Sequence, residues 1–137
     1  MNRIIAGLIL AFFASVSPAL AQTQCVVPAG APATPIFSAA AEGSHILKAA
    51  PGCLLAVYAT PGATAGYLMI FNQKTVPADG AVTPVNCIQV PANTTIAASW
   101  APQPPEWYSS GIVAVFSTTG CFTKTISSTA FIHALVQ

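Results

Sequence analysis

The chain has 137 residues, of which 54% are hydrophobic and only 5% are charged. Four Lys or Arg residues cannot build a basic surface that neutralises a phosphate backbone, which argues against nucleic acid as a partner. Three Asp or Glu residues are also few for an enzyme that works by acid and base groups. The high apolar fraction indicates either buried subunit contacts or an ordinary β domain whose surface is rich in Ser and Thr.

Residues 1–21 are typical of a secretory signal peptide. Arg3 supplies a basic start, an apolar run extends from Ile4 to Val16, and Ala19-Leu20-Ala21 forms a small-residue cleavage site. The run is shorter than the roughly 20 apolar residues that a membrane span needs. We therefore expect a mature chain that begins at Gln22, has no transmembrane segment, carries no net charge, and lies in the periplasm or outside the cell.

Residues 22–41 are predicted to form an Ala/Pro-rich leader. The stretch from Val27 to Pro32 reads VPAGAP and has too little periodicity for the interior of a helix or a strand. Its prolines favour an extended backbone that lies along a surface. Cys25 is the residue expected to hold it in place.

Residues 42–137 are predicted to form one β domain. Apolar runs of strand length alternate with Pro-Gly, Asp-Gly and other turn signals, and the runs are 44–49, 53–60, 66–72, 85–90, 94–100, 112–116 and 129–136. We count about eight strands and no helix. Strands joined by turns rather than by helical crossovers do not build a parallel sheet, so the pattern predicts an antiparallel β-sandwich or a jelly-roll-like domain.

The domain is expected to be organised around residues 111–125. A continuous apolar run from Ile112 to Phe116 lies between Gly111 and the small-residue turn that ends at Gly120. Such a run is short for a helix and suits a strand that is buried on both faces or in the core of a sandwich. Cys121 follows at once, which predicts a corner pinned by a disulfide.

Four cysteines follow the cleavage site, and an even number in an exported domain predicts two disulfides with three alternative pairings. We favour Cys25–Cys53 and Cys87–Cys121. Cys87 and Cys121 share the half of the chain with the strongest strand signals, and Cys25 belongs to a leader that nothing else holds. Metal binding is disfavoured, because no Cys-x-x-Cys pair occurs and neither histidine lies close to a cysteine in the sequence. No cofactor is predicted.

The loop at 99–108 is the best candidate binding site. It gathers Trp100, Trp107 and Tyr108 on a proline-rich backbone, together with Glu106. Rigid aromatic side chains suit sugar stacking or a protein–protein hot spot, because they lose little entropy on binding. The alternative is structural, with the two tryptophans plugging the end of the sandwich.

No catalytic residues are predicted. Each of the three carboxylates has a ready role in a turn or in solvation, and His45 and His133 fall within predicted strands. Lys124 is interpreted as an exposed lysine of an edge strand, where its charge discourages the addition of further strands, rather than as a reactive amine.

The second half of the chain resembles a group of small β modules found in bacteriophage and prophage genomes. The resemblance covers about Gly66 to Phe131 and depends on segments 66–71 (GYLMIF), 77–84 (PADGAVTP), 111–113 (GIV) and 116–125 (FSTTGCFTKT). It implies a structural or decorating module that acts through its surface, and it supplies no catalytic residues. A virion protein would not be expected to carry a signal peptide and disulfides, because phage particles assemble in the reducing cytoplasm. These two features favour a bacterial exported protein that uses the same module.

Three functional hypotheses follow. The first is a non-enzymatic structural or interaction module that binds copies of itself, or a cell-surface or virion-like protein, through sheet surfaces and loops. The second is a carbohydrate-binding module that uses Trp100, Trp107 and Tyr108. The third is an enzyme, which would need a cleft that brings Asp79 or Glu106 to a histidine.

Overall fold

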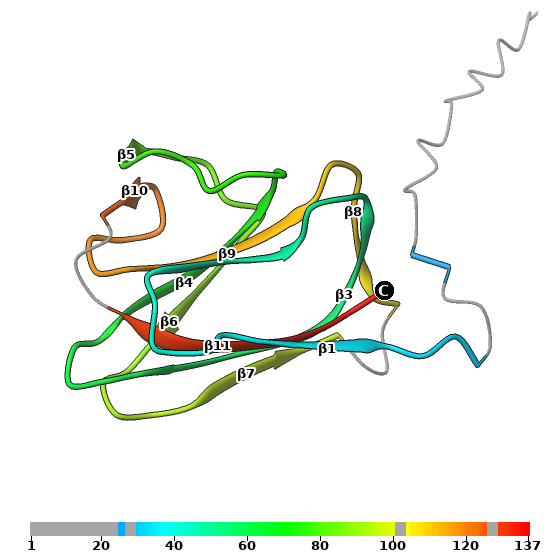
Figure 1. The fold of residues 1–137 in the computed structure, drawn as a ribbon. Coiled ribbons are helices and arrows are strands. Elements are labelled where there is room, and N and C mark those ends of the chain that lie inside the picture. The colour runs from blue at the N-terminus through cyan, green and yellow to red at the C-terminus, as the bar shows by residue number, and fades with distance from the viewer. Residues whose placement is uncertain (1–24, 27–29, 101–103, 126–128) are drawn as a thin grey trace, which may run out of the picture.

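The computed structural model describes residues 25–26, 30–100, 104–125 and 129–137. The signal peptide predicted at 1–21 lies outside the described residues. The described part of the chain is all-β, with antiparallel strands in two stacked sheets and a small strand pair outside them (Figure 1). The predicted β-sandwich class is therefore confirmed. None of the described segments is a helix long and apolar enough to cross a membrane.

The first sheet has five strands. Its members are β1 (Thr34–Phe37), β11 (Ala130–Val136), β3 (Gly52–Pro61), β7 (Ile96–Ser99) and β8 (Glu106–Tyr108). The order is β1-β11-β3-β7, and β8 pairs with the first residues of β3 while β7 pairs with its second half. The long strand β3 therefore holds three neighbours in one sheet.

The second sheet has four strands in the order β2-β9-β4-β6. These are β2 (Ser44–Lys48), β9 (Ile112–Ser117), β4 (Gly66–Asn72) and β6 (Asn86–Val90). The main core lies between the two sheets and includes Leu54, Val57, Phe116 and Ile132. Alternation along each strand supplies these residues, because successive side chains of a strand point to opposite faces.

Every residue of β9 is buried, as the apolar run at 112–116 predicted. Ile112, Ala114 and Phe116 belong to the core between the sheets. Val113 and Val115 point the other way and pack with Met69 and other apolar residues in a second, smaller cluster. A strand with apolar residues on both faces needs a layer on each side of its sheet.

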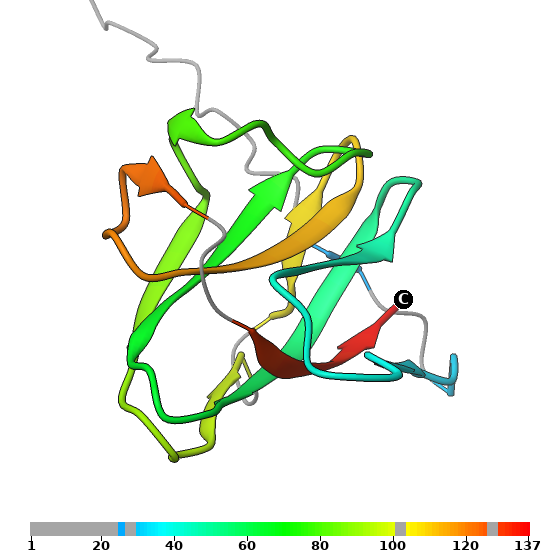
Figure 2. The same ribbon diagram turned by 60° about the vertical axis from the view of Figure 1, so that its left-hand side comes forward.

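The third layer supplies this cover. It contains a two-stranded pair, β5 (Gly80–Ala81) with β10 (Thr123–Lys124), and the loop that leads into β5. Val76, before β5, and Val82, directly after it, pack on the second cluster. Figure 2 shows β5 and β10 as a separate pair beyond β4 and β9.

The two disulfides join Cys25 to Cys53 and Cys87 to Cys121, which is the pairing favoured from the sequence. The first holds the leader against the start of β3. The second joins β6 to the segment that enters the third layer. Both suit an oxidising compartment.

Two features differ from the sequence-based expectations. Thr34–Phe37, within the segment predicted to be a leader, forms β1 and pairs with β11 in register. The sheet therefore begins before residue 42. The expectation that Lys124 is exposed was wrong, because its side chain is buried and its Nζ pairs with Asp79, which directly precedes β5.

Candidate interaction surface

The three aromatic residues of the 99–108 loop do not form one surface. Trp107 and Tyr108 are neighbours in β8, so their side chains point to opposite faces of the sheet. Tyr108 is fully buried, Trp107 is 38% exposed, and Trp100 is half-buried and packs against the core. Residues 101–103 lie outside the described part of the chain.

Tyr108 serves the interior of the sandwich. Its hydroxyl donates a hydrogen bond to Glu106 Oε2 at 3.0 Å and receives one from Asn86 Nδ2 at 3.4 Å. Asn86 also donates to Glu106 directly. Burial raises the pKa of the Tyr108 hydroxyl well above its ordinary value of 10.0, and the Glu106 carboxylate raises it further, against the opposite effect of Asn86. The three side chains connect β8 to β6 across the two sheets.

Trp107 lies beside a surface hollow of about 400 Å³. The hollow is formed where the leader, the turn before β3 and the last residue meet, and its lining includes Pro32, Lys48, Pro51 and Gln137. Trp107 is the cross-strand neighbour of Cys53, so the Cys25–Cys53 disulfide fixes one wall of this hollow. Of the three aromatic residues proposed for ligand binding, only Trp107 lines it.

A different aromatic group stands on the outer face of the five-stranded sheet. Phe37, His133 and Tyr58 are directly opposite one another on β1, β11 and β3. Their rings are stacked, with centroid distances of 4.1 Å from Phe37 to His133 and 5.0 Å from His133 to Tyr58. These distances are close to the spacing of adjacent strands, so the rings stand upright on the sheet and cover one another's faces. We call these three residues the aromatic rib.

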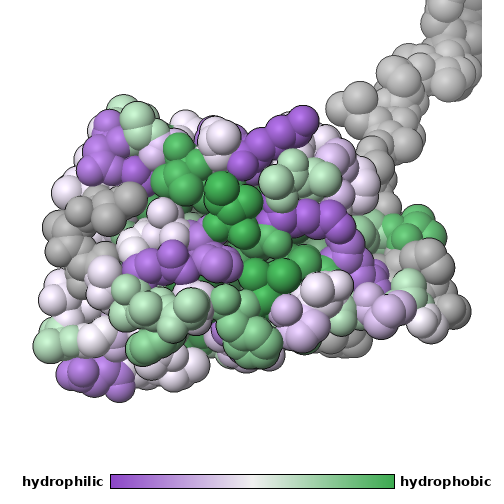
Figure 3. All heavy atoms as spheres, in the orientation of Figure 1, coloured by the Kyte–Doolittle hydropathy of each residue, from purple (hydrophilic) through white to green (hydrophobic). Residues whose placement is uncertain are grey.

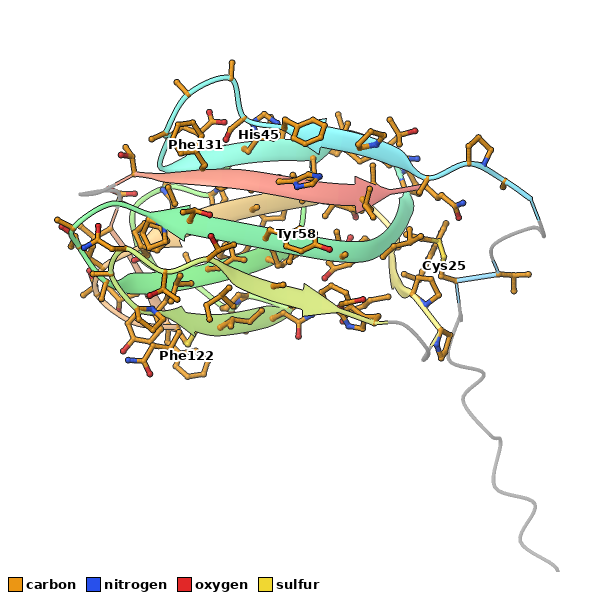
Figure 4. All side chains as sticks on the ribbon, turned by 90° about the horizontal axis from the view of Figure 1, so that it is seen from below. Cys25, His45, Tyr58, Phe122 and Phe131 are labelled. Atoms are coloured by element: carbon orange, nitrogen blue, oxygen red, sulfur yellow. A yellow bond between two sulfur atoms is a disulfide. The ribbon has the colours of Figure 1, made fainter. Side chains whose placement is uncertain are left out.

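The rib is surrounded by uncharged side chains. No Lys, Arg, Asp or Glu occurs in β1, β3, β7 or β11. Phe131 stands next to the rib on β11 and is 54% exposed, and Figure 4, which views this sheet from outside, shows it with Tyr58. The outer face of these four strands consists of Pro35, Phe37, Ala56, Tyr58, Thr60, Ala97, Ser99, Phe131, His133 and Leu135. We call this set the outer face.

His133 has one polar atom without a partner. Its Nε2 is buried and makes no hydrogen bond among the described residues. The rings of Phe37 and Tyr58 on either side offer no donor or acceptor to it. An unpaired buried nitrogen is unfavourable for the stability of the fold.

The two outer surfaces of the sandwich differ in how far other segments cover them. The third layer covers β4 and β9 of the four-stranded sheet, whereas nothing in the described part of the chain covers the outer face. Apolar residues also reach the surface where β1 and β2 are the outermost strands, including Phe37 and Ile46. Figure 3 shows apolar residues as a band across this side of the molecule.

The three carboxylates lie in separate places and have different partners. His45 Nδ1 lies 2.6 Å from Glu42 Oε1, Lys124 Nζ lies 2.5 Å from Asp79 Oδ1, and Glu106 bonds to Asn86 and Tyr108. Within the described ranges, no three His, Cys, Asp or Glu side chains gather into a set that could hold a metal ion.

No protein-family model, curated protein or solved structure matches this chain. The resemblance to phage modules therefore stays a prediction. The rib was not predicted, because its residues come from positions 37, 58 and 133. The signal that could have found part of it is the alternation in β11, where Phe131, His133 and Leu135 all fall on the face opposite the buried alanines and Ile132.

Proposed function

We propose that the protein is an exported, non-enzymatic interaction module that associates with copies of itself through the outer face. The observation that carries this proposal is an exposed sheet face without a single Lys, Arg, Asp or Glu, built around three stacked rings. Exposed sheet surfaces of monomers normally carry charges that oppose association. Interface centres are depleted of charge and enriched in aromatic residues.

The orientation of the rings favours a protein over a sugar. A sugar stacks on the flat face of an aromatic ring, but His133 has both faces covered by its neighbours. Between Phe37 and Tyr58 the rib offers the edge of the His133 ring to an incoming molecule, rather than a flat face. Ring edges pack well against apolar side chains, as they do in the interior of proteins.

A second copy of the chain is the occupant that best matches this surface. An uncharged face gives no electrostatic attraction to a charged partner, and it produces no repulsion between identical copies. In a two-fold arrangement the same patch meets itself, which needs only a self-complementary surface.

The size of the face predicts weak, concentration-dependent association. Four strands spaced about 4.8 Å apart, with seven residues of about 3.3 Å each in β11, give a projected area on the order of 400 Å². A standard stable interface buries about 800 Å² on each partner. Full occupancy therefore requires high local concentration, as on a cell surface, or additional contacts at the edges. A decorating module of the kind that the phage resemblance implied would likewise associate through weak contacts at high local concentration.

Light scattering coupled to size-exclusion chromatography tests the proposal on oxidised, signal-cleaved protein over a wide concentration range. We expect a monomer that converts to a defined oligomer, and Phe131→Lys should raise the Kd for association by about tenfold or more, because it buries an unpaired charge. Phe122→Lys is the matched control, since Phe122 is 72% exposed but follows Cys121 at the third layer. A monomer at every concentration, or equal effects of the two substitutions, would contradict the proposal.

Carbohydrate binding is the second candidate, and one observation favours it. Trp107 is partly exposed beside a hollow of about 400 Å³, on a wall fixed by a disulfide. Titration of the monomer with a panel of glycans should then shift tryptophan fluorescence, and Trp107→Phe should remove the shift while Trp100→Phe keeps it. An unchanged spectrum across the panel would exclude this site.

A further inference from the structure

The third layer contains a lysine in an unusual setting. The Lys124 side chain is only 3% exposed, and its Nζ lies 2.5 Å from Oδ1 of Asp79. An ammonium group loses most of its hydration in such a place, and a single ion pair compensates for this loss only in part. The Asp79 side chain is more than half exposed and borders a hollow of about 470 Å³ that is open to water.

The backbone on both sides of this pair is fixed. Lys124 is the register partner of Gly80 in the β10–β5 pair, which places it one residue from Asp79 across the strands. Ser117 Oγ donates to the carbonyl of Thr123 and accepts from the amide of Thr125, so both neighbours of Lys124 are held to the end of β9. The amine and the carboxyl group are therefore kept together by the fold rather than by chance contact of long side chains.

We propose that Lys124 and Asp79 condense to an intramolecular isopeptide bond after folding. A proton first passes from Nζ to the carboxylate, which leaves a neutral amine and a carboxylic acid. Nζ then attacks Cγ of Asp79, a new N–C bond forms, and the tetrahedral adduct loses one carboxyl oxygen as water with two protons that came from the amine and the acid. The products are one secondary amide and one water molecule, so no oxidant, reductant or external donor is needed.

The closeness of the Lys124 amine to the Asp79 carboxyl group favours amide formation. Groups held in a productive geometry react as if at effective concentrations of about 10⁵ to 10⁸ M, well above the concentration of water that opposes amide formation. The amide is neutral, so the reaction also removes a buried charge. The water leaves through the hollow beside Asp79.

The reaction is expected to be slow. Glu42 pairs with His45, and Glu106 with Asn86 and Tyr108, so neither of the other carboxylates of the described chain shuttles protons at this pair. General acid–base assistance of that kind contributes about 10² to 10⁴ in rate. The bond should therefore accumulate during storage of the folded protein rather than appear within its folding time.

Intact-mass spectrometry of oxidised, signal-cleaved protein during prolonged incubation tests this inference. We expect the mass to fall by one water molecule relative to the disulfide-bonded sequence, and a branched peptide joining residues 79 and 124 after digestion. Lys124→Arg keeps the charge but cannot form the bond, and it should keep the full mass. An unchanged mass in the wild type would overturn the inference.

One competing reaction gives the same mass change and must be separated. Asp79 precedes Gly80, and an Asp-Gly sequence can close to a cyclic imide by losing water to its own backbone. Hydroxylamine cleaves the imide but not the isopeptide, and Lys124→Arg would retain the imide. A loss of water that persists in Lys124→Arg, or that hydroxylamine reverses with chain cleavage, would therefore contradict the isopeptide.

Discussion

His133 of β11 stacks on Tyr58 of β3, and the centroids of the two rings lie 5.0 Å apart on the outer face of the sandwich. The pair joins two strands that are far apart in the sequence. Cross-strand aromatic pairs of this kind contribute roughly 0.2 to 1 kcal/mol to stability. Their larger effect here should be on association, because they stand at the centre of the proposed interface.

Tyr58→Ser should separate these two contributions. We expect the free energy of unfolding to fall by about 1 kcal/mol, because one stacked partner is lost from an exposed face. The free energy of association should decrease by more than the free energy of unfolding, since the rib loses one of its three rings. Urea denaturation of the monomer and light scattering of the same sample measure the two effects. A loss of stability without any change in association would show that the rib is only structural.

Tyr108→Phe should destabilise the fold modestly. The substitution removes the hydroxyl between Glu106 and Asn86, but these two side chains still bond to each other, so we expect a loss of about 1 kcal/mol. Chemical denaturation measures the difference. Tyr58→Phe serves as a control, because Tyr58 lies on the outer face. Equal losses for the two variants would contradict the role of the buried network.

The same residue predicts how stability depends on alkaline pH. The pKa of Tyr108 is raised in the folded state, so the unfolded chain releases this proton at lower pH than the folded one. The stability linked to this group is complete below about pH 10, the ordinary value for tyrosine, and is lost as the pH rises through the folded-state pKa. Denaturation midpoints measured in this range should fall less steeply for Tyr108→Phe than for the wild type.

Gly66→Ala should destabilise the sandwich at a close approach between strands. A Cβ at this position would lie 2.5 Å from Cζ of Phe116 and 2.6 Å from the carbonyl oxygen of Ser117. Overpacking of a core site costs about 1 to 3 kcal/mol. Gly62→Ala is the matched control, because a Cβ there meets nothing within 4 Å. Thermal melts of the two variants should therefore differ clearly.

Removal of the Cys87–Cys121 disulfide should affect the third layer in particular. The bond closes a long loop, so the double substitution to serine is expected to cost about 2 to 4 kcal/mol. Loosening of the third layer would also expose Met69 and its neighbours, which binding of a hydrophobic dye detects. The Cys25–Cys53 double variant should lose stability without this rise in dye binding.

The sequence predicted the fold class well because its signals are local. Turn residues such as Pro61-Gly62 separate the apolar runs, and no helical period competes with them. β1 was not predicted, since Pro35 and the absence of alternation hide it, and its pairing with β11 depends on a partner almost a hundred residues away. Long-range pairing of this kind leaves no mark in a short window of sequence.

The candidate site was predicted less well, for the same physical reason. The proline-rich loop suggested that Trp107 and Tyr108 share a surface, but β8 is a strand, and alternation sends one outward and the other inward. Lys124 looked like an exposed edge residue because nothing near it in sequence indicates that the segment around Asp79 lies across it. Apolar residues on both faces of β9 did indicate that some layer covers its sheet, although not which segment provides it.

Three separate parts of the chain converge on Cys53. Its backbone exchanges hydrogen bonds with Gln137 in both directions, its side chain is bonded to Cys25, and Trp107 is its cross-strand neighbour. Local opening at this end of the sandwich must therefore release the last strand and β8 together, while the leader stays bonded to Cys53, which makes opening a cooperative event rather than gradual fraying. Amide hydrogen exchange at Cys53 and Gln137 should accordingly be slow, and it should proceed at a common rate.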